Sequence, residues 1–441
     1  MSLRSDTLRT LFFQFLMLAT GVVTNIVVAR TLGPEGKGLI SFLSYSLFVA
    51  INLGGLGLQA AAIQGIGKRR FPVATIAGAQ ILLAVGFGIL CAIGMAIFLP
   101  LYQQKMDFDP ALLVFYVPLV VFALLHLNLT GIMIGLGRIK QVNHVRVVTP
   151  LSWMLGAVVV LGFLGGDKTA GAYAWIAAQA IGPLVALAYV VTTVRPRFSA
   201  VGAAARAALK FGLEAYLANL VWTLLLRIDA LLIGYLSGSR EVGIYSVAVL
   251  LGEMLWYLSR SLTTALNPRI AGGTRADALR LTHRAARTAF FAVTAGALGM
   301  LVIVRLAIRL TFGPEFLPSV EPFLLLLPGI ALGALASPIS LYFTQQRGRP
   351  RINALTAAIG LTVNLALNVH WIPRYGAAGA AAASSIAYGI VALSLLLFFR
   401  REPGFELARL LRPRAEDLTL LKETWQAAWA AVPGRRAGPR G

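Results

Sequence analysis

Charged side chains lie inside two consecutive apolar stretches near the middle of the sequence. Four of them are Arg227, Asp229, Glu253 and Arg260. A charge within a membrane-length apolar segment is costly and usually faces a bundle interior or a water-filled cavity. Guanidinium groups bind phosphate and diphosphate oxygens through charge-assisted hydrogen bonds. We therefore predict that Arg227 and Arg260 contact an anionic substrate group. Asp229 and Glu253 are the candidates for carrying a coupling ion, either a proton or Na⁺, and the alternative is that the gradient of the substrate itself suffices.

Further polar residues recur at helical spacing in several apolar stretches, so those of one stretch share a helix face. Asn219 lies two turns before Arg227, and Tyr257 lies one turn after Glu253. Polar stripes on several helices are what a shared aqueous path through a membrane requires. The residues that we predict to bind substrate are Arg227, Arg260, Asn52, Gln59, Asn219, Tyr257 and Asn364. Interhelical hydrogen bonds would explain Gln59 equally well.

The depths of Arg227 and Glu253 predict that the two side chains pair. Arg227 lies nine residues from the end of its stretch and Glu253 eleven residues from the start of the next one. At 1.5 Å per residue both lie roughly 14–16 Å below the same membrane surface. Asp229 lies about 200° around the helix from Arg227 and must face a different neighbour. An alternative interpretation is a fixed network of ion pairs that only holds the helices together.

The elements that position these residues are predicted to be membrane-spanning helices. Hydrophobic residues make up 58% of the 441-residue chain and charged residues only 13%, about half of the share in soluble domains. This composition excludes a cytosolic enzyme, a disordered chain and, with the single Cys91, a disulfide-stapled secreted domain. Twelve runs are long enough to cross a bilayer, near residues 9–31, 39–65, 73–99, 111–135, 147–165, 170–194, 211–236, 242–267, 287–311, 319–344, 352–372 and 377–400. They lack the two-residue alternation of barrel strands, so we expect an all-α polytopic membrane protein.

The distribution of positive charge predicts the orientation of the chain. If the N-terminus is cytoplasmic, 29 of the 39 Lys and Arg residues lie in inner segments and six, including Lys37, in outer loops. The positive-inside rule then places both termini in the cytoplasm. The net charge of +22 is explained by topology and by attraction to anionic membrane lipids, without nucleic acid. The sequence has no phosphate-binding loop, nucleophile elbow or zinc motif, so we expect no catalytic residue, no cofactor and no metal.

Three pairs of short segments indicate an internal repeat. Residues 137–143 match 348–353, residues 167–172 match 375–380, and residues 32–38 match 236–243, at offsets of 211, 208 and about 205. Six spans per half give the two halves the same orientation, and parallel repeats of this kind are typical of transporters with a substrate path between the halves. The expected domains are six-helix bundles at 1–198 and 199–400 around a central cavity, followed by a cytoplasmic amphipathic tail at 401–441.

Several of these segments resemble one family of membrane proteins. They are residues 29–38 (ARTLGPEGKG), 226–234 (LRIDALLIG), 242–246 (VGIYS), 312–316 (FGPEF) and 372–380 (IPRYGAAGA). With these segments the sequence resembles, over about residues 8–400, the bacterial polysaccharide and O-antigen flippases of the multidrug/oligosaccharidyl-lipid/polysaccharide exporter superfamily. The resemblance implies a pair of six-helix bundles in the cytoplasmic membrane that moves an undecaprenyl-diphosphate-linked oligosaccharide to the outer leaflet. Glycosyltransferase or polymerase partners would then act in the same cell-surface polysaccharide synthesis.

Two other functional classes are considered. An ion-coupled drug or solute antiporter of the same superfamily typically keeps an acidic residue in its first helix, whereas residues 9–31 contain no carboxylate. Within the flippases, the peptidoglycan-precursor group has fourteen spans, whereas twelve are predicted here, so the sequence does not favour that group. A membrane polymerase or ligase usually places catalytic loops outside the membrane, and the longest predicted outer loop, residues 100–110, is too short to hold such a domain. The repeating sugar and the driving force leave no motif in the sequence.

Overall fold

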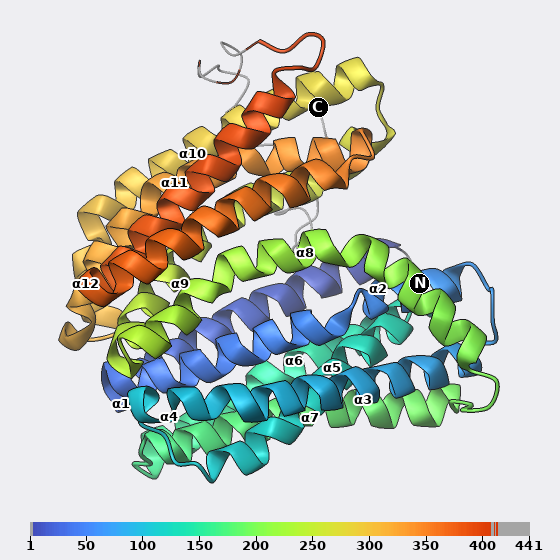
Figure 1. The fold of residues 1–441 in the computed structure, drawn as a ribbon, viewed down its shortest axis with the longest axis horizontal. Helices are drawn as coiled ribbons and strands as arrows, with labels where there is room; N and C mark the ends of the chain where they lie inside the picture. The colour runs from blue at the N-terminus through green and yellow to red at the C-terminus, as the bar shows by residue number, and fades with distance from the viewer. Residues whose placement is uncertain (1–2, 407–409, 411, 413–441) are drawn as a thin grey trace, which may run out of the picture. The chain divides into compact units, whose positions relative to one another are not determined.

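The computed structural model describes residues 3–406 together with positions 410 and 412, and in that part of the chain it consists of helices joined by short non-helical linkers. The predicted amphipathic tail lies, beyond its first few residues, outside the described residues. The helices are α1 (Leu3–Gly55), α2 (Leu58–Gly67), α3 (Val73–Phe98), α4 (Gln103–Met106), α5 (Leu112–Gly135), α6 (Ile139–Gly156), α7 (Lys168–Val194), α8 (Gly202–Leu236), α9 (Ser239–Gly272), α10 (Arg275–Thr311), α11 (Val320–Leu341) and α12 (Pro350–Phe399) (Figure 1). Short π-helical segments, Ala157–Phe163 and Tyr342–Gln346, continue α6 and α11.

Two of the helices are double. The backbone is non-helical at Gly33 in α1 (φ 63°, ψ −170°) and at Gly376 in α12 (φ 54°, ψ −131°), which glycine reaches without a Cβ clash. The halves of α12 run side by side, since Asn364 Nδ2 before the kink donates to Ser384 Oγ after it at 3.2 Å. Ten helices among the described residues are long and apolar enough to cross a membrane. Counting each kinked helix as two spans gives the predicted twelve and confirms the all-α polytopic fold.

Several predicted boundaries were wrong, because hydropathy reveals neither a break within an apolar run nor a helix that continues through polar residues. The predicted span 39–65 is broken between α1 and α2. The segment 268–286, predicted to be a loop, is helical except at the junction of α9 and α10. Thr274 begins α10 there by accepting a hydrogen bond from the Asp277 N–H at 3.2 Å, an N-cap contact.

Lys37 also differs from expectation. The sequence places it in an outer loop, but the second half of α1 passes through this position. The side chain is 5% exposed and donates to Ser41 Oγ at 2.9 Å, one turn along the same helix. A lysine in the first turn after a kink can fold back along its own helix, which a count of loop charges does not anticipate.

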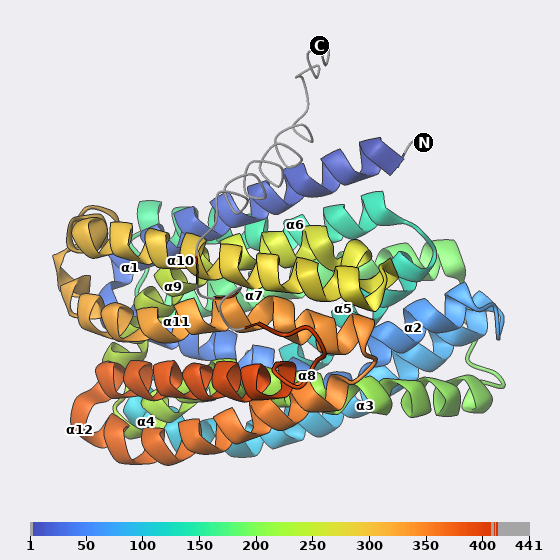
Figure 2. The same ribbon diagram turned by 90° about the horizontal axis from the view of Figure 1, so that it is seen from above.

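Contacts between residues divide the chain into two units. Unit 1 comprises residues 1–220 and 238–243, and unit 2 comprises residues 221–237 and 244–441. The division passes through α8 and through the start of α9. In unit 2, α10, α11 and the two halves of α12 run alongside one another (Figure 2). These units are defined by contacts alone. The predicted six-helix bundles at 1–198 and 199–400, which we expect to fold and move as halves, stay a prediction.

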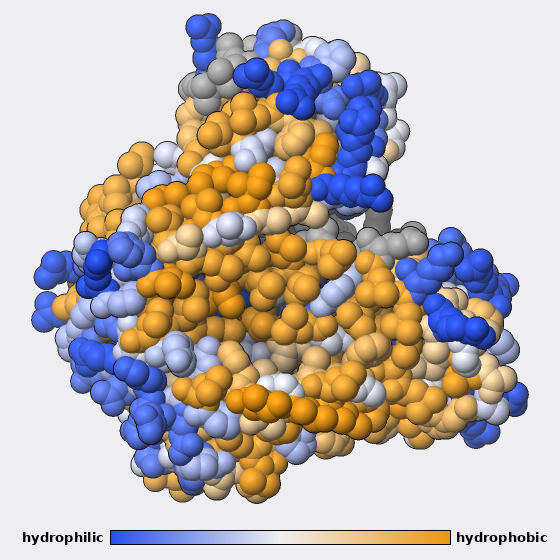
Figure 3. All heavy atoms as spheres, in the orientation of Figure 1, coloured by the Kyte–Doolittle hydropathy of each residue, from blue (hydrophilic) through white to orange (hydrophobic). Residues whose placement is uncertain are grey.

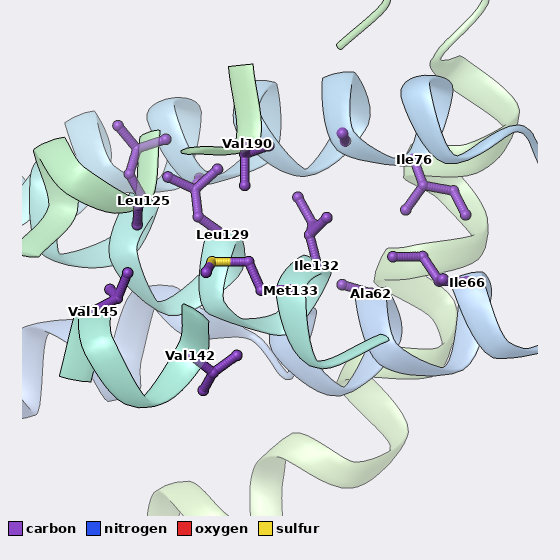
Figure 4. Packing of buried hydrophobic residues seen from close by; sticks show 13 residues of the cluster. Ala62, Ile66, Ile76, Leu125, Leu129, Ile132, Met133, Val142, Val145 and Val190 are labelled. Carbon is purple, nitrogen blue, oxygen red and sulfur yellow. The ribbon is translucent and has the colours of Figure 1, made fainter. Parts of the chain in front are cut away.

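The core of unit 1 is built around α5. Leu125, Leu129, Ile132 and Met133 of this helix pack against residues of α2, α3, α6 and α7 (Figure 4). Lipid is as apolar as these side chains, so close van der Waals packing rather than exclusion of water holds membrane helices together. Small residues such as Ala77, fully buried on α3, allow that close packing.

The apolar surface of the helices is extensive. Large hydrophobic side chains are left exposed, including Phe163 at 80% and Val302 at 82%. On the face shown in Figure 3, hydrophobic residues cover the middle of the helices and hydrophilic residues gather toward their ends. An exposed apolar band of this kind marks a membrane-contacting surface, and the chain is a multi-pass membrane protein.

Two segments of unit 1 that match in the internal repeat touch each other reciprocally. A Cβ on Gly38 would collide with the carbonyl oxygen of Ser239, and a Cβ on Gly243 would collide with that of Pro34. The offset is 205 residues for both pairs of positions, 34 with 239 and 38 with 243. Small residues four apart, as in Ser239 and Gly243, let helix backbones approach closely.

Candidate functional site

The predicted pair of Arg227 and Glu253 is present in unit 2. Arg227 Nη2 on α8 donates to Glu253 Oε1 on α9 at 2.6 Å. The side chains are 18% and 28% exposed, so the pair is partly buried. The hairpin of α8 and α9, with its short turn at residues 237–238, brings the two positions to one level. Arg227 and Glu253 therefore pair as the sequence predicts.

Asp229 faces a different set of neighbours, as its position on the helix predicts. The residue is 1% exposed. Its carboxylate accepts a short hydrogen bond from the Tyr245 hydroxyl, one from Ser384 Oγ at 2.8 Å and one from the backbone N–H of Ala230 at 2.8 Å. These donors come from α8, α9 and α12. The carboxylate therefore ties three helices together.

Hydrogen bonds continue from this carboxylate along α12. Asn364 Nδ2 donates to Ser384 Oγ at 3.2 Å, and Asn368 Nδ2 donates to Asn364 Oδ1 at 2.9 Å. Both asparagines are 0% exposed. Asn364, predicted to bind substrate, thus lies inside a buried polar network that joins the halves of α12. Its possible contact with substrate stays a prediction.

Ser384 is the residue of this network that sequence reasoning missed. The signal available was a pair of serines, Ser384 and Ser385, within a helix otherwise rich in alanine. Both are used, since Ser385 Oγ accepts a hydrogen bond from the Gly329 N–H at 2.7 Å. Tyr245 entered the sequence analysis only as part of a family-like segment, because its partner Asp229 is sixteen residues away on another helix.

A small hollow of about 20 Å³ lies beside the ion pair. Its lining includes Arg227, Glu253, Tyr245, Trp256 and Tyr388. The Trp256 ring lies 5.3 Å from the Tyr388 ring and its Nε1 donates to the Ile330 carbonyl at 2.9 Å. A hollow of this size holds about one water molecule. Water at this point would keep the pair solvated within an otherwise apolar span.

The other predicted residues of α9 lie at the surface of unit 2. Tyr257 is 49% exposed, and Arg260 is exposed one turn further along. Arg260 is seven residues from Glu253, about 10 Å along the helix at 1.5 Å per residue. The structure thus places two guanidinium groups at two depths along the α8–α9 hairpin.

Three predicted residues belong to unit 1. Asn219 Nδ2 donates to Asn52 Oδ1 at 3.3 Å, which brings α8 and α1 together. Gln59 lies beyond the break after α1, half-buried in the first turn of α2. The break is also where α8 approaches, because a Cβ on Gly57 would collide with the carbonyl oxygen of Gly212. Asn52 and Asn219 are therefore neighbours, and Gln59 is not part of their contact.

In the described part of the chain, no three His, Cys, Asp or Glu side chains come together as a metal site would require. The oxygens of Asp229 are taken up by hydrogen-bond donors, and Glu253 is paired with Arg227. The arrangement therefore consists of one partly buried ion pair beside a carboxylate that three donors hold.

Several solved structures share this fold. A lipid II flippase, MurJ, in an inward closed conformation aligns with a TM-score of 0.72 at 14% identity, over 95% of this chain and 91% of that one. An inward-facing multidrug resistance MATE family transporter of the MOP superfamily aligns at 0.69 and 16% identity, over 93% and 96%. A MOP superfamily transporter from Pyrococcus furiosus, whose reverse binding-pocket polarity suggests a different function, aligns at 0.56 and 15% identity, over 90% and 94%. The chain has the fold of MOP superfamily transporters.

The sequence assigns the family within this class. The pattern of the polysaccharide biosynthesis protein family matches residues 3–273, more than half of the chain. The chain belongs to the polysaccharide biosynthesis protein family, which confirms the resemblance seen in the sequence. A comparison with curated proteins gives no match.

Proposed function

We propose that the protein moves a polyprenyl-diphosphate-linked oligosaccharide across the cytoplasmic membrane for cell-surface polysaccharide synthesis, such as that of lipopolysaccharide. The family and the fold support a transporter of a lipid-linked saccharide. One solved structure with this fold is a lipid II flippase. The observation that carries the proposal is the pairing of Arg227 with Glu253 inside a membrane-spanning hairpin, beside a water-sized hollow.

The diphosphate exchanges with Glu253 at Arg227. Within the described residues Glu253 accepts one hydrogen bond, whereas Asp229 accepts three. The fork of a guanidinium group suits phosphate oxygens as well as a carboxylate. Glu253 therefore holds Arg227 in place when substrate is absent and yields it when a diphosphate arrives. Asp229 stays in its network and keeps α8, α9 and α12 in register.

Arg260 receives the diphosphate at the second depth, and the polar residues Asn52, Gln59, Asn219 and Tyr257 contact sugar hydroxyls. Asn364 joins them only when the buried network that holds it opens. The halves at 1–198 and 199–400 alternate between inward and outward access around a central cavity. Both termini are cytoplasmic, as the positive-inside count indicates, and a glycosyltransferase or a polymerase is the partner in the same polysaccharide synthesis. Glu253, and Asp229 if its network opens, couple the cycle to an ion.

An ion-coupled drug or solute antiporter is the second candidate. It is favoured by the similarity of the fold to a multidrug resistance MATE transporter and by the partial exposure of Glu253, 28% for its side chain. A carboxylate that is partly solvated and paired with one arginine is able to exchange a proton. This candidate requires that a small cationic solute is transported in exchange for an ion that moves down its own gradient.

The test uses purified full-length protein in proteoliposomes that contain a polyprenyl-diphosphate-linked oligosaccharide. Flipping is measured as the fraction of the oligosaccharide accessible to an external, membrane-impermeant glycosidase. We expect Arg227→Gln and Arg260→Gln each to slow flipping about tenfold or more, since a charge-assisted hydrogen bond contributes roughly 1.5–3 kcal/mol. Arg305→Gln, which removes an arginine from the apolar α10, is the matched control and should flip at the parent rate.

Parent rates in both test variants would refute the assigned role of the arginines. The antiporter candidate is tested in the same vesicles with a fluorescent cationic dye and an imposed proton gradient. Dye accumulation that is lost in Glu253→Gln, with no flipping of the lipid-linked oligosaccharide, would replace the first proposal by the second.

A further inference from the structure

Five arginines line one open hollow at the end of unit 2 where α11 connects to α12. They are Arg275, Arg347, Arg349, Arg351 and Arg401, and the hollow has a volume of about 750 Å³. Arg275 comes from the start of α10, and Arg401 follows the end of α12. Three separate parts of the chain therefore bring guanidinium groups to one place, which the positive-inside rule alone does not require.

One carboxylate, Glu402, shares this lining and is already engaged. It accepts from Arg275 Nη2 at 2.7 Å and from the Tyr342 hydroxyl at 3.0 Å, and Arg347 Nε lies 3.2 Å from its Oε1. Burial raises the pKa of Glu402, but the hydrogen bonds from Arg275 and Tyr342 outweigh it, so the pKa lies below its ordinary value of 4.5. Glu402 is ionised at neutral pH, and the lining keeps a net excess of four positive charges.

The remaining three arginines point to an anionic ligand. Among the described residues, no ion pair joins Arg349, Arg351 or Arg401 to a carboxylate. The hollow also contains the start of α12, where Pro350 is the first helical residue and no side chain caps the helix. The N-terminus of a helix favours an anion through its free N–H groups and its dipole. Guanidinium groups around an uncapped helix start form a site for phosphate oxygens.

The surroundings favour a lipid over a soluble anion. Phe343, Ile352 and Phe398 also line the hollow, and Arg401 lies over the Phe398 ring at 5.6 Å from its centre. On the same helix, Leu393 and Leu397 are 57% and 47% exposed, as on a surface that faces acyl chains. Figure 3 shows hydrophilic residues gathered at this end of the unit beside hydrophobic helix surface. A headgroup and the first atoms of its acyl chains would meet matching surfaces here.

We propose that this hollow is a binding site for the headgroup of an anionic phospholipid of the cytoplasmic leaflet, and that a headgroup with two phosphates fits it best. Four excess positive charges match a doubly charged headgroup better than a singly charged one. Basic pockets at the cytoplasmic ends of membrane helices bind lipids of this kind. The site is separate from the Arg227–Glu253 pair, so the proposal does not depend on the substrate of transport.

The test measures lipid binding to the purified full-length protein in a neutral detergent, by native mass spectrometry and thermophoresis. The probes are tetraoleoyl cardiolipin, dioleoylphosphatidylglycerol and dioleoylphosphatidylcholine. The test variant is Arg349→Gln/Arg351→Gln. The matched control is Arg138→Gln/Lys140→Gln, which removes the same charge from the repeat-related segment of unit 1.

We expect the parent to bind cardiolipin most tightly and phosphatidylcholine not at all. The test variant should bind cardiolipin roughly thirtyfold more weakly, since each lost arginine removes about 1 kcal/mol, or about fivefold in affinity. The control should stay within about twofold of the parent. Arg349 and Arg351 are exposed, and unchanged melting without lipid would show that the variant is folded. If the double variant does not fold, the single variant Arg401→Gln replaces it and should weaken cardiolipin binding severalfold.

Three results would overturn the proposal. Equal weakening in the test variant and the control would mean that cardiolipin is attracted by the positively charged face as a whole. Unchanged binding in the test variant would place the lipid elsewhere. Displacement of cardiolipin by micromolar inorganic pyrophosphate would show that the hollow takes a soluble anion rather than a lipid.

Discussion

Exchanging the charges of Arg227 and Glu253 separates a structural pair from a substrate-binding one. The perturbation is the double variant Arg227→Glu/Glu253→Arg, compared with the two single variants. A structural pair needs only opposite charges at the two positions, whereas a diphosphate needs the positive charge on α8. Stability and transport should therefore respond differently to the exchange.

The magnitude follows from the burial of the pair. Removing one partner of a buried ion pair costs about 3–5 kcal/mol, and fully exposed pairs contribute about 0–1 kcal/mol. With the side chains 18% and 28% exposed, loss of the attraction alone should cost about 2 kcal/mol. Each single variant also sets two like charges together, so we expect it to lose at least this much. The exchanged pair should recover about 1–2 kcal/mol of this as a coupling energy.

The assays are unfolding in detergent by titration with sodium dodecyl sulfate, for the coupling energy, and flipping in proteoliposomes. We expect the exchanged variant to recover stability but not flipping, since Glu at position 227 repels the diphosphate. If flipping returns with stability, the pair serves only to hold α8 and α9 together, and the proposed exchange with substrate is wrong. A coupling energy near zero would show that the two side chains do not depend on each other.

Three further predictions concern other contacts. Gly38→Ala should lower the melting temperature markedly, because its Cβ would collide with the Ser239 carbonyl, whereas Gly94→Ala, with no atom within 4 Å of the added Cβ, should leave it unchanged or raise it. Ser384→Ala should destabilise the protein by about 1–2 kcal/mol in the same titration, since the buried carboxylate and an amide on α12 lose a shared partner; an unchanged midpoint would mean that the network is not formed. The melting temperature of the parent should fall relative to that of Glu402→Gln as the pH drops below about 4.5, because Glu402 has a lowered pKa and its stabilising effect is lost when it is protonated; a difference that stays constant from pH 7 to pH 3.5 would contradict this.

The sequence was sufficient to predict the membrane-spanning part of the fold. Twelve spans follow from hydropathy because lipid exposure demands apolar side chains over about 20 residues. The kinks at Gly33 and Gly376 fall where the apolar runs were separated. The helical extensions at 202–210 and 268–286 could not be found in this way, because helices outside hydrocarbon need not be apolar.

The site was predictable only where helix geometry decides it. Arg227 and Glu253 lie on consecutive helices joined by a short turn, so residue counting sets their relative depth. Ser384 contacts Asp229 across 155 residues, and such a tertiary contact leaves no periodic signal. The buried position of Asn364 likewise depends on how the halves of α12 fold back on each other, which no local pattern encodes.

The reciprocal contact of residues 34–38 with residues 239–243 has the local symmetry of an isologous interface, in which residue i meets j and j meets i. Each glycine is opposed by a carbonyl oxygen of the other segment. In such a contact both segments present the same kind of surface, a glycine and a carbonyl oxygen one turn apart, and each fits the other. The two segments are thus constrained as a pair: a larger side chain at either glycine pushes the same two backbones apart, and a compensating change in only one segment cannot restore both halves of the contact.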